Sequence, residues 1–367
     1  MGTRNEFIPF AVSHPGRLLG RELEERGIKQ KDFAKQIGMQ ATHLNSLIKG
    51  KMDISDKIAV KLEAALGISA LEWLNMQNKY AYYSAKIEER GKEEAEALLK
   101  ENAIGVTLNL KAFYSAFGII SSSASLRIKE LFAIGNPDEI SGLEVNCGGY
   151  FKKSEKCQID DKNMRTWLFI AQCKAVQAAV PFEYVDGNAE KAAERISIMA
   201  NANTLTVSDI RTILEENGIA YLHVPKLEKT PIDAYSTRVD GKYVIVATYR
   251  HNDMDKLAFD VLHELGHISL HLKKDGQSYI STEVGEKDAK EREADEFARD
   301  FLISPDVWKK IESASARSLN PYVVVSIIAK KAVEYNISPS IAVSRYKHDT
   351  DDFDHKRFRS PKIRESC

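Results

Sequence analysis

The chain lacks the features that mark secreted and membrane proteins. Its 367 residues include only 4 cysteines and no CxxC pair, so we expect neither a disulfide framework nor a zinc site made of cysteines. The opening residues, MGTRNEFIPF, hold no apolar run typical of a signal peptide, and no stretch of about 18 apolar residues follows. We therefore expect a cytoplasmic protein with reduced thiols and no membrane partner.

An excess of charge of one sign is also missing. The 52 Lys+Arg and 53 Asp+Glu give a net charge of −1, so the molecule as a whole has no basic field to attract nucleic acid or an anionic membrane. Any contact with DNA must come from a local patch. The length predicts two or three domains with sizeable cores, because a domain typically holds about 100 to 200 residues.

Glycines and helix signals divide the chain into four parts. Residues 1–85 hold short helical patterns separated by glycines and predict a small all-α domain. Residues 86–187 form a helical connecting region of unassigned role, which starts with a charged helix at 86–103 interrupted at Gly91. Residues 188–345 mix helices with strands, whereas residues 346–367 are dense in charge and predict a disordered tail. The predicted fold class is mostly α with a small β-sheet, or α+β.

A motif in the first part has the pattern of a helix-turn-helix. In QKDFAKQIGMQATHLNSL, residues 30–47, small Ala34 lets two helices approach and Gly38 supplies the turn between them. The second helix then exposes polar side chains that can hydrogen-bond base edges in the major groove. The candidate base contacts are Gln40, Thr42, His43 and Asn45, and the candidate phosphate contacts are Gln30, Lys49 and Lys51.

Residues 14–77 resemble the XRE-type helix-turn-helix domains of phage repressors. Their opening, HPGRLLGRELEERGIKQKDFA, is similar to that of antitoxin repressors such as HigA. The resemblance implies double-stranded operator DNA as a partner and a homodimer, because one recognition helix reads only a half-site. The alternative is a helical module whose polar face docks another protein.

The strongest chemical motif is His263-Glu264-Leu265-Gly266-His267, inside an apolar helical pattern. Residues four apart share a helix face, so both imidazoles can bind one divalent metal ion while Glu264 acts as the catalytic general base. This pattern is typical of metallopeptidases, in which the ion acidifies a water molecule and polarises the scissile carbonyl. The expected cofactor is Zn²⁺, with Mn²⁺ as the alternative.

Helical phase selects a third ligand from the segment KEREADEFARDFL. When positions around the helix axis are counted from Ala294 at about 100° per residue, the apolar face is centred at about 10°. Glu291 then lies at about 60° and Glu293 at about 260°. Glu291 is therefore the expected metal ligand, and Glu293, which points to solvent, is the reserve. Asp295, at about 100°, is expected to accept a hydrogen bond from a ligating imidazole.

The segments HELGHISLH, EREADEFA and LISP together resemble the ImmA/IrrE family of bacterial metallopeptidases over about residues 188–345. The resemblance implies a gluzincin-like domain that cleaves proteins, with a helix-turn-helix repressor or a toxin as its protein partner. It also implies that the strand GKYVIVATY, residues 241–249, is a sheet edge that binds an extended peptide. His271 matches the family pattern, either as an outer ligand or substrate contact, or as a structural histidine.

The two motifs predict a bacterial transcriptional regulator with a zinc-dependent endopeptidase domain. It would relieve repression by cleaving a helix-turn-helix repressor or itself, and the helical segment 81–102 is the nearest candidate for self-cleavage. One alternative is an antitoxin-like repressor whose metallopeptidase fold acts as a sensor or protein-binding module without turnover. Another is a peptidase whose helix-turn-helix only docks a protein. The intact Glu264 favours an enzyme.

Overall fold

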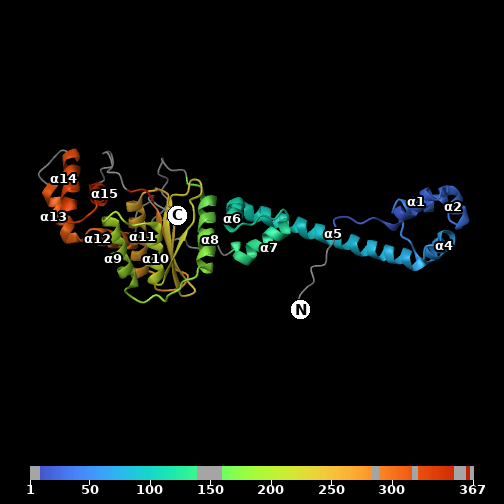
Figure 1. Cartoon of the computed structure of the whole chain (residues 1–367), viewed down its shortest axis with the longest axis horizontal. Helices are drawn as coiled ribbons and strands as arrows, with labels where there is room; N and C mark the ends of the chain where they lie inside the picture. The colour runs from blue at the N-terminus through green and yellow to red at the C-terminus, as the bar shows by residue number, and fades with distance from the viewer. Residues whose placement is uncertain (1–8, 139–158, 283–288, 316–320, 351–360, 364–367) are drawn as a thin grey trace. The chain divides into compact units, whose positions relative to one another are not determined.

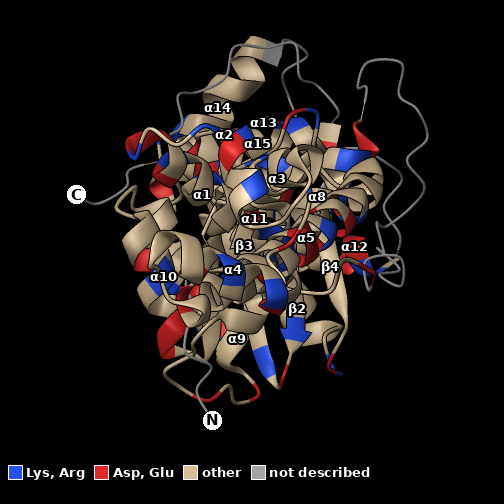
Figure 2. Ribbon diagram, turned by 90° about the vertical axis from the view of Figure 1, so that its right-hand side faces the viewer, with Lys and Arg blue, Asp and Glu red and all other residues tan. Residues whose placement is uncertain are grey.

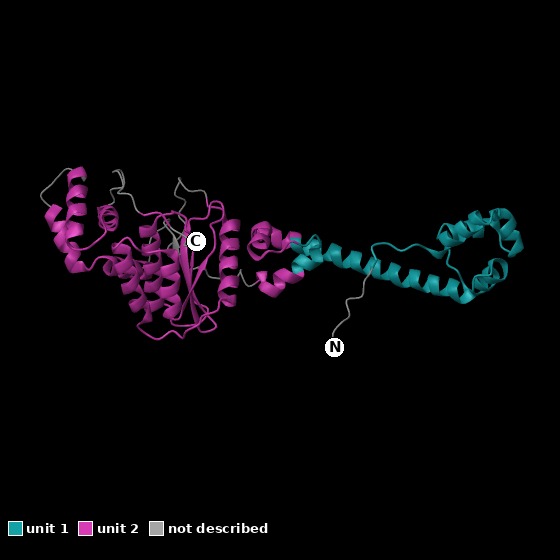
Figure 3. Ribbon diagram, in the orientation of Figure 1, with its two compact units in different colours: residues 1–101, 121–128 teal, residues 102–120, 129–367 magenta. Residues whose placement is uncertain are grey.

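The computed structural model divides into two compact units (Figures 1 and 3). One unit comprises residues 1–101 and 121–128, and the other comprises residues 102–120 and 129–367. Within them, the structure describes residues 9–138, 159–282, 289–315, 321–350 and 361–363.

The first unit contains the predicted helix-turn-helix. Its elements are α1 (Pro15–Glu25), α2 (Gln30–Gln36), α3 (Ala41–Ile48), α4 (Asp56–Leu66) and most of α5 (Ala70–Thr107). Gly38 has φ +59° at the turn from α2 to α3, a conformation that favours glycine. Ala34 is buried in this unit's core beside Phe33 and Leu44, so the small residue and the glycine have the structural roles that the motif predicts.

Helix α5 continues through Gly91, so the predicted interruption there is wrong. One glycine costs an exposed helix only about 1 kcal/mol relative to alanine. The flanking residues are good helix formers, and Lys92 pairs with Glu88 at 2.8 Å, one turn earlier. These favourable terms suffice to carry the helix past the glycine.

The second unit combines helices with one sheet, as the α+β prediction requires. Its helices are α6 (Leu110–Phe117), the part of α7 (Ala124–Ile134) after Ile128, α8 (Asp161–Gln177), α9 (Asn188–Asn201), α10 (Val207–Glu216), α11 (Met254–Leu270), α12 (Ala289–Leu302), α13 (Pro305–Ser315), α14 (Pro321–Glu334) and α15 (Pro339–Thr350). The strands are β1 (Ile219–His223), β2 (Ile232–Val239), β3 (Lys242–Ala247) and β4 (Ser278–Thr282).

The sheet has the strand order β1-β3-β2-β4, with β1 parallel to β3 and the other pairs antiparallel. Strands β2 and β3 form a hairpin with Val239 opposite Lys242, and the two residues between them, Asp240-Gly241, are a pair that favours two-residue hairpin turns. Helix α8 covers one face, where Trp167 donates a hydrogen bond to the carbonyl of Val224, and α11 covers the other (Figure 1). Alternate strand residues therefore enter two separate cores.

The prediction that residues 241–249 form a sheet edge is wrong. Strand β3 lies between β1 and β2, so its backbone groups are paired on both sides, and among the described strands the edges are β1 and β4. The error arises because β1 pairs beside β3 in parallel, a long-range pairing that hydrophobic periodicity does not reveal.

The predicted start of the tail at residue 346 also differs from the structure. Helix α15 continues to Thr350, because Tyr346 packs against the core and Lys347 is buried. Farther on, Pro361 accepts a hydrogen bond from the backbone of Met254, and Lys362 lies 3.0 Å from Asp253. The other domain boundaries stay predictions.

Charges of both signs are interspersed along the ribbon, in keeping with the near-zero net charge (Figure 2). Among the described helices, none combines the length and the apolar character that a bilayer crossing needs.

Candidate metal centre

The candidate centre forms where α11 and α12 pack closely against each other at Gly266. A Cβ atom at this position would lie 3.0 Å from the Cα atom of Ala294 and 3.1 Å from the Cβ atom of Phe297. Only glycine allows this approach without a shift of α12. Glu291 and Asp295 flank the contact on α12, so the close approach brings their carboxylates to the histidines of α11.

Three side chains converge there on one point. His263 Nε2 lies 3.2 Å from Glu291 Oε2, and His267 Nε2 lies 3.3 Å from Glu291 Oε1. The two Nε2 atoms are 3.0 Å apart. All three residues are buried, and their ligand atoms lie within 4.8 Å of one another. This is a compact cluster of two imidazoles and one carboxylate.

The second ring nitrogen of each histidine also has a partner. His263 Nδ1 lies 2.9 Å from Asp295 Oδ1, and His267 Nδ1 lies 3.1 Å from His271 Nδ1. The ring of Tyr279, on β4, stacks parallel to that of His267 with a centroid separation of 4.3 Å. Both imidazole rings are therefore fixed in orientation by contacts outside the cluster.

Glu264 is fully buried beside the cluster and is held from the sheet side. The hydroxyl of Ser236, on β2, donates a hydrogen bond to Glu264 Oε2. Glu264 Oε1 has no hydrogen-bond partner among the described residues. Ser236 pairs with Tyr279 across β2 and β4, so both side chains lie on the face of the sheet that α11 covers. One carboxylate oxygen is thus held by the sheet, and the other is buried without a hydrogen bond from the described residues.

Burial and hydrogen bonding shift the pKa values in the cluster. Burial alone would raise the pKa of Glu291, but hydrogen bonds with the two histidines lower it to about 2. Burial lowers the pKa of His267 to about 4. Burial also favours neutral His263, but its bonds to Asp295 and Glu291 outweigh this and raise its pKa to about 9, so metal binding must displace a proton from this ring. Burial raises the pKa of Glu264 to about 8.

The donor set fits a divalent metal ion. An ionised Asp295 can only accept, so His263 Nδ1 carries a proton and its Nε2 is free to offer a lone pair once the ring is neutral. A lone pair that faces a second imidazole nitrogen and a carboxylate in a buried site is repelled unless a proton or a metal cation lies among them, so a divalent ion can take the place of the proton on His263. Two imidazoles and one carboxylate form a ligand set that is found in catalytic zinc sites.

The cluster includes the residues that helical phase selected. Glu291 faces the histidines and Asp295 contacts His263, whereas Glu293 lies outside the cluster, with His271 Nε2 2.8 Å from its Oε2. Sequence reasoning missed Ser236 and Tyr279. The signal for Ser236 was a small polar residue inside an otherwise buried strand, at a position that the hairpin register assigns to the α11 face.

The residues predicted to contact DNA lie on the surface of the first unit. Gln40 precedes α3 as its N-cap, Thr42, His43 and Asn45 lie on α3, and Lys49 is its C-cap. Their side chains, and that of Gln30 at the start of α2, are exposed. The structure thus makes all of them accessible, and their contacts with DNA stay predictions.

Comparison with known proteins assigns both regions to families. Residues 19–73 match the family model for a helix-turn-helix, and residues 214–347 match the model for an IrrE N-terminal-like domain. The second match spans α11 and α12 and therefore contains the whole histidine and glutamate cluster.

Similar proteins cover a smaller part of the chain. The HTH-type transcriptional regulator YddM of Escherichia coli K12 is 28% identical over 72 residues, 20% of this chain and 77% of that protein. An antidote protein of a plasmid maintenance system from Nostoc punctiforme is 31% identical over 24% of this chain and 93% of its own, with a TM-score of 0.22. The antitoxin HigA of Pseudomonas aeruginosa, solved with the higBA promoter, is 28% identical over 23% and 92%, with a TM-score of 0.22. The chain thus joins a region that matches helix-turn-helix domains of the XRE type to a region that matches the IrrE N-terminal-like domain.

Proposed function

We propose that this protein is a DNA-binding regulator that carries a zinc-dependent endopeptidase, with Mn²⁺ as the alternative ion. The observation that carries the proposal is the convergence of His263, His267 and Glu291 beside a buried Glu264. The match of residues 214–347 to the IrrE N-terminal-like domain supports the same reading.

In this proposal, His263, His267 and Glu291 hold the ion. When bound, the ion polarises a peptide carbonyl and acidifies a water molecule. Ser236 fixes one oxygen of Glu264, so the unpartnered Oε1 accepts the proton that the water loses. Burial raises the pKa of Glu264, and a divalent ion held beside it would favour the ionised carboxylate that can take up a proton and pass it to the leaving amine.

The protein substrate is proposed to bind in an extended form along β4. This strand is an edge of the sheet, and within the described residues it pairs only with β2. Its Tyr279 contacts His267, so a peptide added beside β4 would run close to the cluster. Main-chain hydrogen bonds to an edge strand hold a peptide largely independently of its side chains.

A separate helix-turn-helix repressor is a better candidate substrate than the segment 81–102 of this chain. That segment lies inside the continuous helix α5. A helix must unwind before its backbone can pair with a strand, because its amides and carbonyls are already hydrogen-bonded to one another. Cleavage of a partner at an exposed extended loop avoids this cost.

The first unit is proposed to bind double-stranded operator DNA as a homodimer. The exposed polar side chains of α3 and the match of residues 19–73 to a helix-turn-helix support this role. Cleavage of a repressor bound at the same operator would then relieve repression.

The test compares the purified full-length wild type with Glu264→Gln, each loaded with zinc. Each is incubated alone and with candidate helix-turn-helix repressors or toxins encoded nearby, with and without operator DNA. New chain termini are then mapped by mass spectrometry. Glutamine keeps the shape of the side chain but cannot accept the proton, so zinc should stay bound while cleavage stops.

Equal cleavage by Glu264→Gln would remove the catalytic role assigned to this residue. If the zinc-loaded wild type cleaves no partner, the antitoxin-like repressor that binds proteins without turnover becomes the better account.

A further inference from the structure

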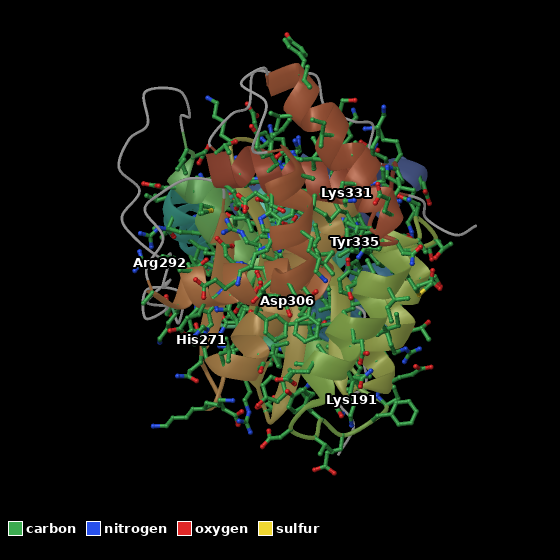
Figure 4. All side chains as sticks on the ribbon, turned by 90° about the vertical axis from the view of Figure 1, so that its left-hand side faces the viewer. Lys191, His271, Arg292, Asp306, Lys331 and Tyr335 are labelled. Carbon is green, nitrogen blue, oxygen red and sulfur yellow. The ribbon has the colours of Figure 1, made fainter. Side chains whose placement is uncertain are left out.

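A series of hydrogen bonds leads outward from the histidine and glutamate cluster through His271, a residue that the proposed reaction does not use. His267 Nδ1 lies 3.1 Å from His271 Nδ1, and His271 Nε2 lies 2.8 Å from Glu293 Oε2. His271, labelled in Figure 4, follows the last residue of α11 as its C-cap. Glu293 lies on α12, two residues beyond the ligand Glu291.

The donors and acceptors in this series of hydrogen bonds can be assigned from its outer end, at Glu293. An ionised Glu293 has only acceptors, so His271 Nε2 carries the proton that it shares with the carboxylate. In a neutral imidazole the other nitrogen is then an acceptor, so His271 Nδ1 receives the proton of His267 Nδ1. His267 is left with a lone pair on Nε2, the nitrogen that lies 3.3 Å from Glu291. This is the tautomer that a metal ligand requires.

We propose that His271 and Glu293 form a positioning relay that fixes the tautomer and ring orientation of His267 for metal binding. The inference rests on the proposed function, because it assigns these two residues a role toward the same ion. The relay gives His267 the support that Asp295 gives directly to His263.

The two supports differ in burial, and this sets how strongly each acts. Asp295 is 5% exposed and contacts its histidine directly. The side chain of His271 is 6% exposed, but that of Glu293 is 57% exposed, so water competes for its carboxylate. Removal of an outer partner of a metal ligand typically weakens metal binding by about 10 to 100-fold. We expect that removal of the His271 side chain weakens metal binding about 10-fold. Removal of the Glu293 carboxylate should weaken it only a few-fold.

The experiment measures the Zn²⁺ affinity of the full-length chain by competition with a chromogenic chelator. His271→Leu keeps the bulk of the side chain but removes both hydrogen bonds. His271→Gln retains one acceptor for His267 and one donor for Glu293 on its terminal amide. Glu293→Gln removes the charge of the carboxylate. Its matched control is Glu296→Gln on the exposed side of the same helix.

The relay predicts that His271→Leu weakens Zn²⁺ binding about 10-fold and that His271→Gln restores most of it. Glu293→Gln should lose a few-fold and Glu296→Gln should match the wild type. The absorption spectrum of the Co²⁺-loaded chain should change in His271→Leu and not in Glu296→Gln, because only the former releases a ligand ring from its fixed orientation.

Unchanged Zn²⁺ affinity in folded His271→Leu, or an equal loss in His271→Gln, would overturn the relay and leave the metal site intact. If circular dichroism shows that His271→Leu is unfolded, the test is the difference in Zn²⁺ affinity between Glu293→Gln and Glu296→Gln. Equal affinities of these two variants would then overturn the relay. A wild-type chain that binds no Zn²⁺ would refute the proposed function and the relay together.

Discussion

Substitution of Gly266 by alanine should weaken metal binding without touching any ligand. The new Cβ atom would lie 3.0 Å from the Cα atom of Ala294, whereas ordinary contacts begin at 3.4 Å, so α12 must give way by a few tenths of an ångström. Metal sites tolerate ligand displacements of about 0.2 Å. Because Glu291 is on α12 and both histidines are on α11, we expect the affinity for Zn²⁺ to fall by about 10-fold.

The effect of this substitution on stability is smaller and has two opposing parts. Alanine in place of a mid-helix glycine gains about 1 kcal/mol of helix propensity. Overpacking between two helices costs about 1 to 3 kcal/mol. The net free energy of unfolding should therefore stay level or fall by up to about 2 kcal/mol.

Gly91 is the matched control because it too is inside a helix, but nothing lies within 4 Å of the Cβ atom it would gain. Gly91→Ala should stabilise its helix by about 1 kcal/mol and leave metal binding unchanged. The assays are Zn²⁺ competition titration and thermal unfolding of each variant. If Gly266→Ala stabilised the protein as much as Gly91→Ala and bound Zn²⁺ as tightly as the wild type, the close approach of α11 and α12 would not be what assembles the site.

Three other predictions concern the base, its support and the DNA surface. In the chelator-treated chain, burial raises the pKa of Glu264 from 4.5 to about 8, so the folded state retains a proton that the unfolded state releases. The free energy of unfolding should therefore fall as pH rises from about 4.5 to 8. Urea unfolding of Glu264→Gln at several pH values should lack this part of the pH dependence. Ser236→Ala should lower kcat for a cleaved partner with little change in KM or zinc content, and Ser236→Thr, which keeps the hydroxyl, should recover it; equal loss in both variants would count against the hydrogen bond. Asn45→Ala should relax base preference by about 1 to 3 kcal/mol in a bound-fragment selection, whereas Lys49→Ala should weaken all sequences alike and reduce the salt dependence; a selection that enriched no sequence would favour protein docking.

Local patterns predicted the parts of this structure that depend on residues close in sequence. The helix-turn-helix pattern of residues 30–47 located α2, α3 and the turn at Gly38. The apolar phase of one helix was enough to place Glu291 on the inward face and Glu293 on the outward face, because a helix that packs by one face has a fixed inward direction. That Glu291 binds a metal ion stays a prediction.

The features that sequence reasoning missed depend on contacts between distant segments. The parallel pairing of β1 with β3 moves the sheet edge to β4, and no periodicity within either strand encodes it. Ser236 acts on Glu264 only because β2 packs against α11. Glu293 faces away from the core of its helix, as predicted, yet His271 reaches it from the end of α11. Side chains at the edge of a helix face can therefore take part in a site.

The zinc content of the purified full-length chain is the most direct test of the central claim, which is that His263, His267 and Glu291 hold one divalent ion. The wild type and Glu264→Gln should each bind about one ion, because Glu264 is the base and not a ligand. His263→Ala and His267→Ala should bind none, and Glu291→Ala should bind far more weakly than Glu293→Ala. Full zinc content in folded His263→Ala and His267→Ala would contradict the assignment of the site.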